Sequence, residues 1–244
     1  ISSDIQSLAG LSTKCRKLPD NSPVIITKTS LLYFTYNIDI PSENPQANTT
    51  QDIMFTEIYQ QLYAKVPDIL FDNWVGNTKY DEIVIFGCGS SYYAGLLGQI
   101  FIEELVKTRC TVRYAADLQY HDLSLYSDKT LFIGITQSGE TADTLQVLKK
   151  LKDRDTLVMT NNNMSQAATL AKNVIYLDCG TERAVASTKT FTASVLSLLG
   201  LCEAIDLAEL LGAFSTILAD TKEIERWANV IKDYDHVLFL ARYI

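Results

Sequence analysis

The sequence contains little histidine and no closely paired cysteines. Its two histidines, His121 and His236, lie too far apart along the chain to predict a metal cluster. The five cysteines are an odd number, and no two of them have the C-x-x-C spacing. This usage is typical of reduced thiols in a cytosolic protein and argues against a disulfide framework or a zinc site. We therefore expect no metal and a cytoplasmic location.

The sequence also lacks Lys/Arg runs and long apolar segments. Its net charge is −8, from 21 basic and 29 acidic residues, so we expect no nucleic-acid partner. The apolar stretches are interrupted well short of the roughly 20 residues that a membrane helix needs, so we expect no membrane contact. The absence of Walker A and G-x-G-x-x-G motifs disfavours a nucleoside triphosphate or a dinucleotide. There is also no G-x-S-x-G elbow and no His-Glu-x-x-His motif.

The sequence pattern predicts three domains or domain fragments, with a linker at the boundary between the first two. Residues 1–47 contain β-branched and aromatic runs beginning at Val24 and Leu31, which predict a hairpin or a sheet remnant. Residues 41–52 are polar, include two prolines and predict a linker. The main domain is expected at residues 48–234, and a strand at 236–241 would open another domain at residues 235–244. The chain begins with Ile1 instead of Met, so we expect a portion of a longer protein.

The main domain alternates apolar runs with helical patterns. A helical pattern begins at residue 53 and extends to Pro67, and another follows Ser91 to about residue 106. Further helices are expected near 116–121, 141–151 and 165–171, then over 188–207 and from there to about 231. Strands that are apolar on both faces and separated by helices are typical of a parallel sheet covered on both sides. The predicted fold class is therefore α/β, a doubly wound sheet of five parallel strands. The runs expected to form them are 83–86, 111–114, 131–135, 156–159 and 174–177.

Three loops follow predicted strands and offer groups that bind anions. Ligands of such sheets bind beyond the carboxyl ends of the strands. The strings Phe86-Gly-Cys-Gly-Ser-Ser91 and Thr136-Gln-Ser-Gly-Glu-Thr141, together with residues 180–189, place hydroxyls and glycines at expected helix starts. Free N–H groups at helix starts attract phosphate. From the residues alone, we predict a site for a phosphorylated sugar or polyol.

Structural explanations for these residues stay open. A glycine turn with capping side chains would account for each loop taken alone. Glu140 would repel a bound phosphate and must point elsewhere, with helix capping as its simplest role. Lys189 could supply positive charge, but a lysine in the first turns of a helix is more commonly solvated. Residues 160–163 form a fourth loop at a strand end, and we expect them mostly to cap a helix. His121 is either a general base or, more commonly, a structural or surface residue.

Four strings in the same order resemble the SIS (sugar isomerase) family. The string from Thr136 to Leu145 is similar to its S-Q-S-G-E-T-A-D-T-L motif. The other three resemble the glutamine–fructose-6-phosphate aminotransferases of this family: Cys88-Gly-Ser-Ser-Tyr92 is similar to C-G-T-S-Y, and residues 179–192 are similar to G-T-E-x-x-V-A-S-T-K-x-F-T. Glu57-Ile-Tyr-Gln-Gln61 resembles the K-E-I-x-E-Q segment that opens their isomerase region. More weakly, residues 1–47 resemble the tail of their glutaminase domain.

The resemblance implies a ligand, a site and a reaction. The ligand would be fructose 6-phosphate or glucosamine 6-phosphate, the assembly a homodimer, and no cofactor would take part. The full enzyme would use ammonia from glutamine to aminate and isomerise the ketose, which requires a carboxylate base. We assign no catalytic residue, because those of the family lie in regions that this sequence does not match. The residues implied to hold the phosphate and nearby hydroxyls are Ser90, Ser91, Thr136, Gln137, Ser138 and Thr141, with Val185 and Ser187 contacting the sugar.

Two other functions remain possible from the sequence. One is a non-catalytic SIS module that senses a sugar phosphate. Such regulators usually carry a DNA-binding segment, and no basic helix-turn-helix pattern is present. The other is a different SIS isomerase or a deaminase. The Val185-Ala-Ser-Thr-Lys189 string and the glutaminase-like tail at residues 1–47 argue against this second alternative.

Overall fold

The computed structural model describes residues 14–16, 25–26, 31–32, 37–39, 50–63, 80–202 and 206–238. They divide between two compact units, Ile1–Ile205 and Asp206–Ile244. Near the N-terminus, β1 (Lys14–Arg16) pairs antiparallel with β4 (Asn37–Asp39), and β2 (Ile25–Ile26) pairs antiparallel with β3 (Leu31–Leu32). The hairpin expected from the two apolar runs is therefore present. The origin of residues 1–47 in a glutaminase-type domain stays a prediction, because most of them lie outside the described residues.

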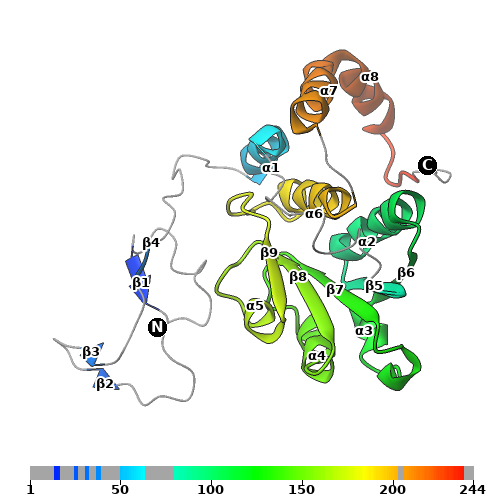
Figure 1. Cartoon of the computed structure of the whole chain (residues 1–244). Coiled ribbons are helices and arrows are strands. Elements are labelled where there is room, and N and C mark those ends of the chain that lie inside the picture. Colours follow the sequence, from blue (N-terminus) through cyan, green and yellow to red (C-terminus); the bar gives the residue numbers. More distant parts are fainter. Residues whose placement is uncertain are drawn as a thin grey trace. The chain divides into compact units, whose positions relative to one another are not determined.

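A five-stranded parallel sheet forms the centre of the first unit (Figure 1). Its strand order is β6-β5-β7-β8-β9, and every neighbouring pair is parallel. This is the flavodoxin-like order, and it confirms the predicted α/β fold class with five strands. The strands are β5 (Glu82–Gly87), β6 (Arg109–Tyr114), β7 (Thr130–Thr136), β8 (Asp155–Thr160) and β9 (Asn173–Tyr176).

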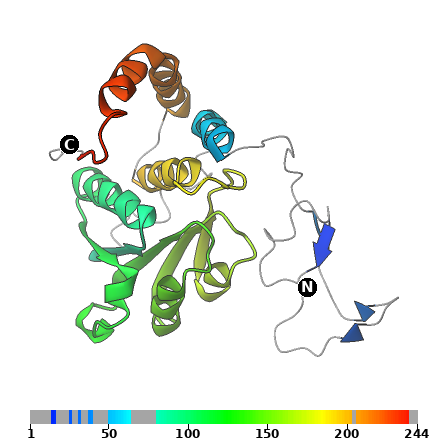
Figure 2. The same ribbon diagram turned by 180° about the vertical axis from the view of Figure 1, so that it is seen from behind.

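Helices cover both faces of this sheet, as Figures 1 and 2 show from opposite sides. On one face lie α2 (Ser90–Phe101), which continues into a π-helical turn (Ile102–Val106), and α6 (Lys189–Gly200). On the other lie α3 (Ala115–Leu118), α4 (Ala142–Lys150) and α5 (Gln166–Leu170). A 3-10 turn, Leu123–Leu125, precedes β7.

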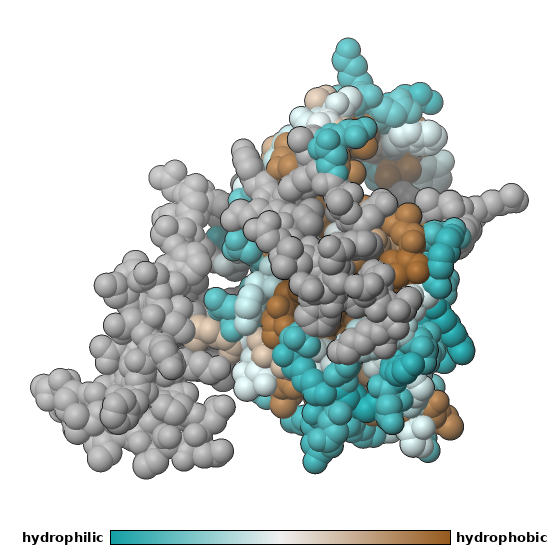
Figure 3. All heavy atoms as spheres, viewed as in Figure 1, coloured by the Kyte–Doolittle hydropathy of each residue, from teal (hydrophilic) through white to brown (hydrophobic). Residues whose placement is uncertain are grey.

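The alternation of side chains along β5 explains the two-sided core. Ile83 and Ile85 belong to the apolar cluster that includes Leu198 of α6. Val84 and Phe86 point the other way, into a second cluster with residues of α4. Successive side chains of a strand point to opposite faces, so each apolar run supplies both cores. The outer surface of the α3–α5 layer is mostly hydrophilic (Figure 3).

Helix α1 (Thr50–Gln60) and the 3-10 turn Gln61–Tyr63 pack against α6. The helix begins inside the stretch 41–52 that the sequence predicts as a linker. A helix from residue 53 to Pro67 was expected. The observed helix begins earlier and ends at Gln60, and residues 64–67 lie outside the described part.

The second unit contains α7 (Leu207–Ala219) and α8 (Thr221–Ile231). The sequence predicts one long helix over 188–207, but α6 ends at Gly200. A new helix then begins after Asp206, whose carboxylate accepts a hydrogen bond from the Glu209 N–H at 3.1 Å. The strand predicted from residue 236 does not form over residues 236–238, and residues 239–241 lie outside the described part. A strand needs a neighbouring strand to complete its hydrogen bonds.

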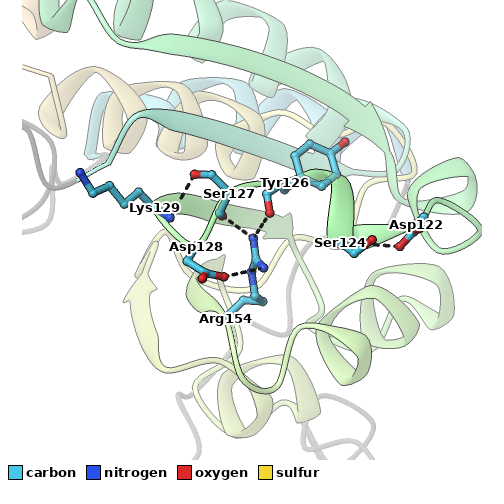
Figure 4. A network of polar contacts seen from close by, with 7 residues as sticks. All are labelled: Asp122, Ser124, Tyr126, Ser127, Asp128, Lys129 and Arg154. Carbon is cyan, nitrogen blue, oxygen red and sulfur yellow. Dashed lines mark hydrogen bonds and ion pairs between the residues drawn. The ribbon is translucent and has the colours of Figure 1, made fainter.

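A single arginine holds the loop that leads into β7 (Figure 4). The Arg154 guanidinium donates to the Tyr126 carbonyl at 2.8 Å and to the Ser127 carbonyl. It also lies 3.3 Å from Asp128 and 5.7 Å from the Phe132 ring centroid. Asp128 is fully exposed, so water screens the ion pair and the two carbonyl bonds contribute most.

We predict that Arg154→Lys lowers the free energy of unfolding by about 1–2 kcal/mol, because an ammonium cannot reproduce the planar fork of donors. Urea denaturation followed by far-UV circular dichroism measures the change. Arg109→Lys is the matched control, since the Arg109 side chain is 77% exposed and makes one ion pair at 3.6 Å. Equal urea midpoints for the two variants would contradict the prediction.

Candidate functional site

The strand register brings the first two predicted loops together. Gly87, the last residue of β5, pairs with Ile135, next to the end of β7. The chain leaves β5 towards α2 on one face of the sheet and leaves β7 towards α4 on the other. This is the topological switch point, where open parallel sheets bind ligands. A Cβ atom on Gly87 would lie 3.0 Å from the Ile135 carbonyl oxygen and 3.0 Å from the Ser91 Cβ atom. The start of α2 therefore lies directly beside the end of β7.

The first loop presents two serine hydroxyls at the start of α2. Gly89 precedes the helix with φ 56° and ψ −129°, and no side chain caps the helix. Ser90 is exposed and Ser91 is half-buried. Within the described residues, neither hydroxyl has a hydrogen-bond partner, so both are free to donate to a ligand.

The second loop is a tight turn closed by its own hydroxyls. Thr136 Oγ1 accepts a hydrogen bond from the Gly139 N–H at 3.1 Å and lies 3.2 Å from Thr141 Oγ1. Ser138 Oγ accepts from the Glu140 N–H at 3.1 Å. These bonds bring the predicted residues Thr136, Ser138 and Thr141 together around one turn.

Gly139 is required by this turn for two reasons. Its φ is +70°, in the left-handed region that favours glycine. A Cβ atom there would lie 2.1 Å from Ser165 Oγ, which is far inside van der Waals contact.

Glu140 points away from the start of α4. Its Oε1 atom accepts a hydrogen bond from the Gln166 N–H at 2.8 Å, in the first turn of α5. The expectation that this acid points elsewhere and caps a helix is confirmed, but the helix it caps is the next one along the chain. A negative charge at a helix start is stabilised by the N–H groups there.

The helix starts at this edge of the sheet differ in electrostatics. Besides Glu140, α5 is capped by Ser165 Oγ, which accepts from the Ala168 N–H at 3.3 Å. At the start of α6, Glu182 supplies the hydrogen-bond acceptor. Its Oε1 atom accepts from the N–H groups of Thr188 at 2.8 Å and Thr190 at 3.2 Å. Neither α2 nor α4 has a side-chain cap. The positive ends of these two helices therefore remain available to an anion.

The third loop, residues 180–189, is folded around Glu182. Ser187 Oγ donates to Glu182 Oε2 at 3.2 Å, so this hydroxyl is already engaged. Val185 is 97% exposed. The structure thus leaves Val185 accessible and holds Ser187 in the loop, and among the described residues neither side chain has a hydrogen bond to the first two loops.

Lys189 is not a solvated lysine, so this part of the sequence interpretation is wrong. Lys189 is only 4% exposed, and its Nζ atom donates a hydrogen bond to Gln60 Oε1 at 2.8 Å. The lysine is buried because α1 packs over the start of α6. A single sequence does not show that packing.

Two asparagines after β8 link the loops, a role that the capping prediction missed. Asn161 Nδ2 donates to the Gly180 carbonyl at 2.7 Å, and its Oδ1 accepts from the Cys179 N–H at 3.1 Å. Asn162 Nδ2 donates to the Ser138 carbonyl at 3.2 Å. Strand β8 lies between β7 and β9, so polar residues at its end reach the loops on both sides. That position in the sheet was the signal that could have identified them.

The cysteine and histidine nearest these loops, and the metal-binding side chains of the described residues, were the remaining candidates for chemistry. Burial, followed by the nearby Asp143 carboxylate, raises the pKa of the Cys88 thiol above its ordinary value, which disfavours a thiolate. His121 is exposed. In the part of the chain that the structure describes, no group of three or more His, Cys, Asp or Glu side chains is placed to hold a metal ion. No helix among those residues is long and apolar enough to cross a membrane.

Comparison with known proteins identifies the family of this chain. The SIS domain family matches residues 78–204. The glutamine–fructose-6-phosphate aminotransferase of Clostridium perfringens is 30% identical over 93% of this chain and 40% of its own length. That of Chlamydia caviae is 39% identical over 70% of this chain and 31% of its own length.

A solved structure extends the comparison to the fold. The C-terminal domain of the glucosamine-fructose-6-phosphate aminotransferase from Francisella tularensis has a TM-score of 0.62 and 28% identity, covering 80% of this chain and 62% of that one. The chain spans less than half the length of the two curated relatives. With its five-stranded parallel sheet and its matched residues, this chain belongs to the SIS domain family.

Proposed function

We propose that this chain is the sugar-phosphate-binding part of a glutamine–fructose-6-phosphate aminotransferase, with fructose 6-phosphate or glucosamine 6-phosphate as its ligand. The observation that carries the proposal is the pair of helix starts, α2 and α4, which meet at the switch point without side-chain caps. A phosphate dianion would accept hydrogen bonds from both. The names of the relatives support the choice of ligand.

The phosphate is proposed to lie between the first and second loops. Neutral hydroxyls and backbone N–H groups suit this role, since they bind an anion in a protein of net charge −8 without a cluster of basic residues. The sugar would extend towards Val185 and Ser187 in the third loop. The residues proposed to hold the phosphate and its neighbouring hydroxyls are Ser90, Ser91, Thr136, Gln137, Ser138 and Thr141.

The proposed reaction needs groups beyond these. Amination and isomerisation of a ketose require a base that removes a proton next to the imine carbon. Glu140 and Glu182, the acids of the second and third loops, already accept hydrogen bonds from helix N–H groups. We therefore assign the chain the binding of substrate and propose no catalytic residue within it.

We further propose that the protein is a cytoplasmic homodimer, as the family resemblance implies. In helix α6, Ala193, Leu196 and Leu198 are buried within this chain and are not free to form the interface. Sedimentation equilibrium should show a dimer at micromolar concentration. A monomer at the highest soluble concentration would refute the proposal.

We predict that the chain binds fructose 6-phosphate in calorimetric titration and does not bind unphosphorylated fructose under the same conditions. Ser138→Ala should raise the Kd about tenfold or more, since it removes one hydrogen bond to a charged group. Ser215→Ala in α7 is the control, because Ser215 is exposed and far along the chain from these loops.

Circular dichroism must show the same helix and strand content in both variants. Equal affinity of Ser138→Ala and the wild type would remove Ser138 from the site. Binding of fructose as tight as that of its phosphate would remove the phosphate site altogether.

A second pair of variants tests the shape of the turn. Gly139→Ala adds a Cβ atom 2.1 Å from Ser165 Oγ as well as backbone strain, whereas Gly89→Ala adds a Cβ atom with nothing within 4 Å. We expect Gly89→Ala to lose about 1–3 kcal/mol from backbone strain alone. Gly139→Ala should lose more and should also abolish phosphate-dependent binding. Equal thermal midpoints for the two variants would contradict this account of the turn.

A further inference from the structure

Helix α1 carries a buried carboxylate that holds the third loop. Glu57 is 3% exposed, although it lies on a helix at the surface of the unit. Its Oε1 atom accepts a hydrogen bond from the Arg183 N–H at 2.5 Å, and its Oε2 atom accepts from the Ala184 N–H at 3.2 Å. One side chain therefore binds two successive backbone N–H groups of a loop about half the chain away.

The end of α1 and the 3-10 turn after it hold the helix that follows this loop. Gln60 Oε1 accepts from Lys189 Nζ at 2.8 Å, and Gln61 Oε1 accepts from Thr192 Oγ1. Both partners lie in the first turn of α6. Glu57, Gln60 and Gln61 thus fix the third loop and the helix start behind it.

The third loop is closed from two sides by two different acids. Glu182 accepts from the groups at the far end of the loop, on Ser187, Thr188 and Thr190. Residues 183 and 184 lie within the segment that Glu182 closes, but their N–H groups donate to Glu57 instead. Val185, which is almost fully exposed, follows directly.

We propose that Glu57 is a positioning residue that sets the third loop for the sugar moiety of the ligand. The inference rests on the proposed function, in which Val185 and Ser187 contact the sugar. A carboxylate is needed because it offers one acceptor oxygen to each N–H group, whereas a glutamine offers one acceptor and turns an NH₂ group towards the other. Hydrogen bonds from backbone N–H groups to an ionised carboxylate are also the stronger kind.

This role has a signature that a general loss of stability lacks. In the described part of the chain, the hydrogen bonds of Glu57 go to residues 183 and 184 and none goes to the first or second loop, where the phosphate is proposed to bind. Its substitution should therefore weaken the sugar-dependent part of binding and leave the phosphate-dependent part unchanged. The ratio of the Kd for inorganic phosphate to the Kd for fructose 6-phosphate measures this selectivity.

The experiment titrates the 244-residue chain with inorganic phosphate and with fructose 6-phosphate. We expect Glu57→Gln to raise the Kd for fructose 6-phosphate about tenfold, as for one charged hydrogen bond, with the Kd for phosphate within about twofold of wild type. Glu57→Asp keeps both acceptors on a shorter side chain and should give a smaller loss. The control is Glu104→Gln, which makes the same change of charge at a side chain that is 65% exposed.

The outcomes separate the two proposals. Unchanged binding of both ligands by Glu57→Gln, or an equal loss for both, overturns the positioning role while the proposed function stands. If the wild type binds neither ligand, the proposed function fails. The proposed role of Glu57 in sugar binding then fails with it. Hydrogen exchange still tests the clamp, by which we mean the hydrogen bonds from the Arg183 and Ala184 N–H groups to Glu57. Faster exchange of the Arg183 and Ala184 amides in Glu57→Gln supports the clamp, and unchanged exchange removes it.

Discussion

Strand β7 lies between β5 and β8, and all seven of its residues are buried. Its backbone groups are away from water, so they must pair with both neighbours, and this pairing fixes the register of the sheet. Gly87 then lies opposite Ile135, and Thr136 opposite Thr160. The loops after β5, β7 and β8 consequently begin in one row at one edge of the sheet. The candidate site is a result of this central pairing more than of any one loop.

The electrostatics of the site follow from how the helix starts are satisfied. Helices α5 and α6 use Glu140 and Glu182, carboxylates that belong to the preceding loops. Helices α2 and α4 lack such groups and instead place serine and threonine hydroxyls nearby. An external anion at these two starts would replace the caps that the chain does not provide. This arrangement would let an acidic protein offer the proposed phosphate site, because the attraction comes from groups next to the anion and not from the net charge.

The positions of the strands and of the loops after them could be predicted from short stretches of sequence. Runs such as 83–86 are apolar on both faces and identify the strands, and glycines followed by hydroxyls mark their ends. The end of α6 at Gly200 was missed because the apolar pattern continues past it into the next helix. Burial of Lys189, the bridges made by Asn161, and the clamp by Glu57 depend on contacts between distant segments. Such contacts have no signal in periodicity or turn chemistry.

The two acids of the third loop illustrate this division. Glu182 bonds groups five to eight residues away, a local contact of the kind that turn chemistry can suggest. Glu57 bonds groups 126 and 127 residues away, so its role depends on α1 packing beside α6. In the proposed site, phosphate affinity would depend on the starts of α2 and α4, and sugar selectivity would depend on α1, which precedes the sheet in the chain. Because phosphate affinity and sugar selectivity would depend on different contacts, a substitution that changes one would leave the other unaltered.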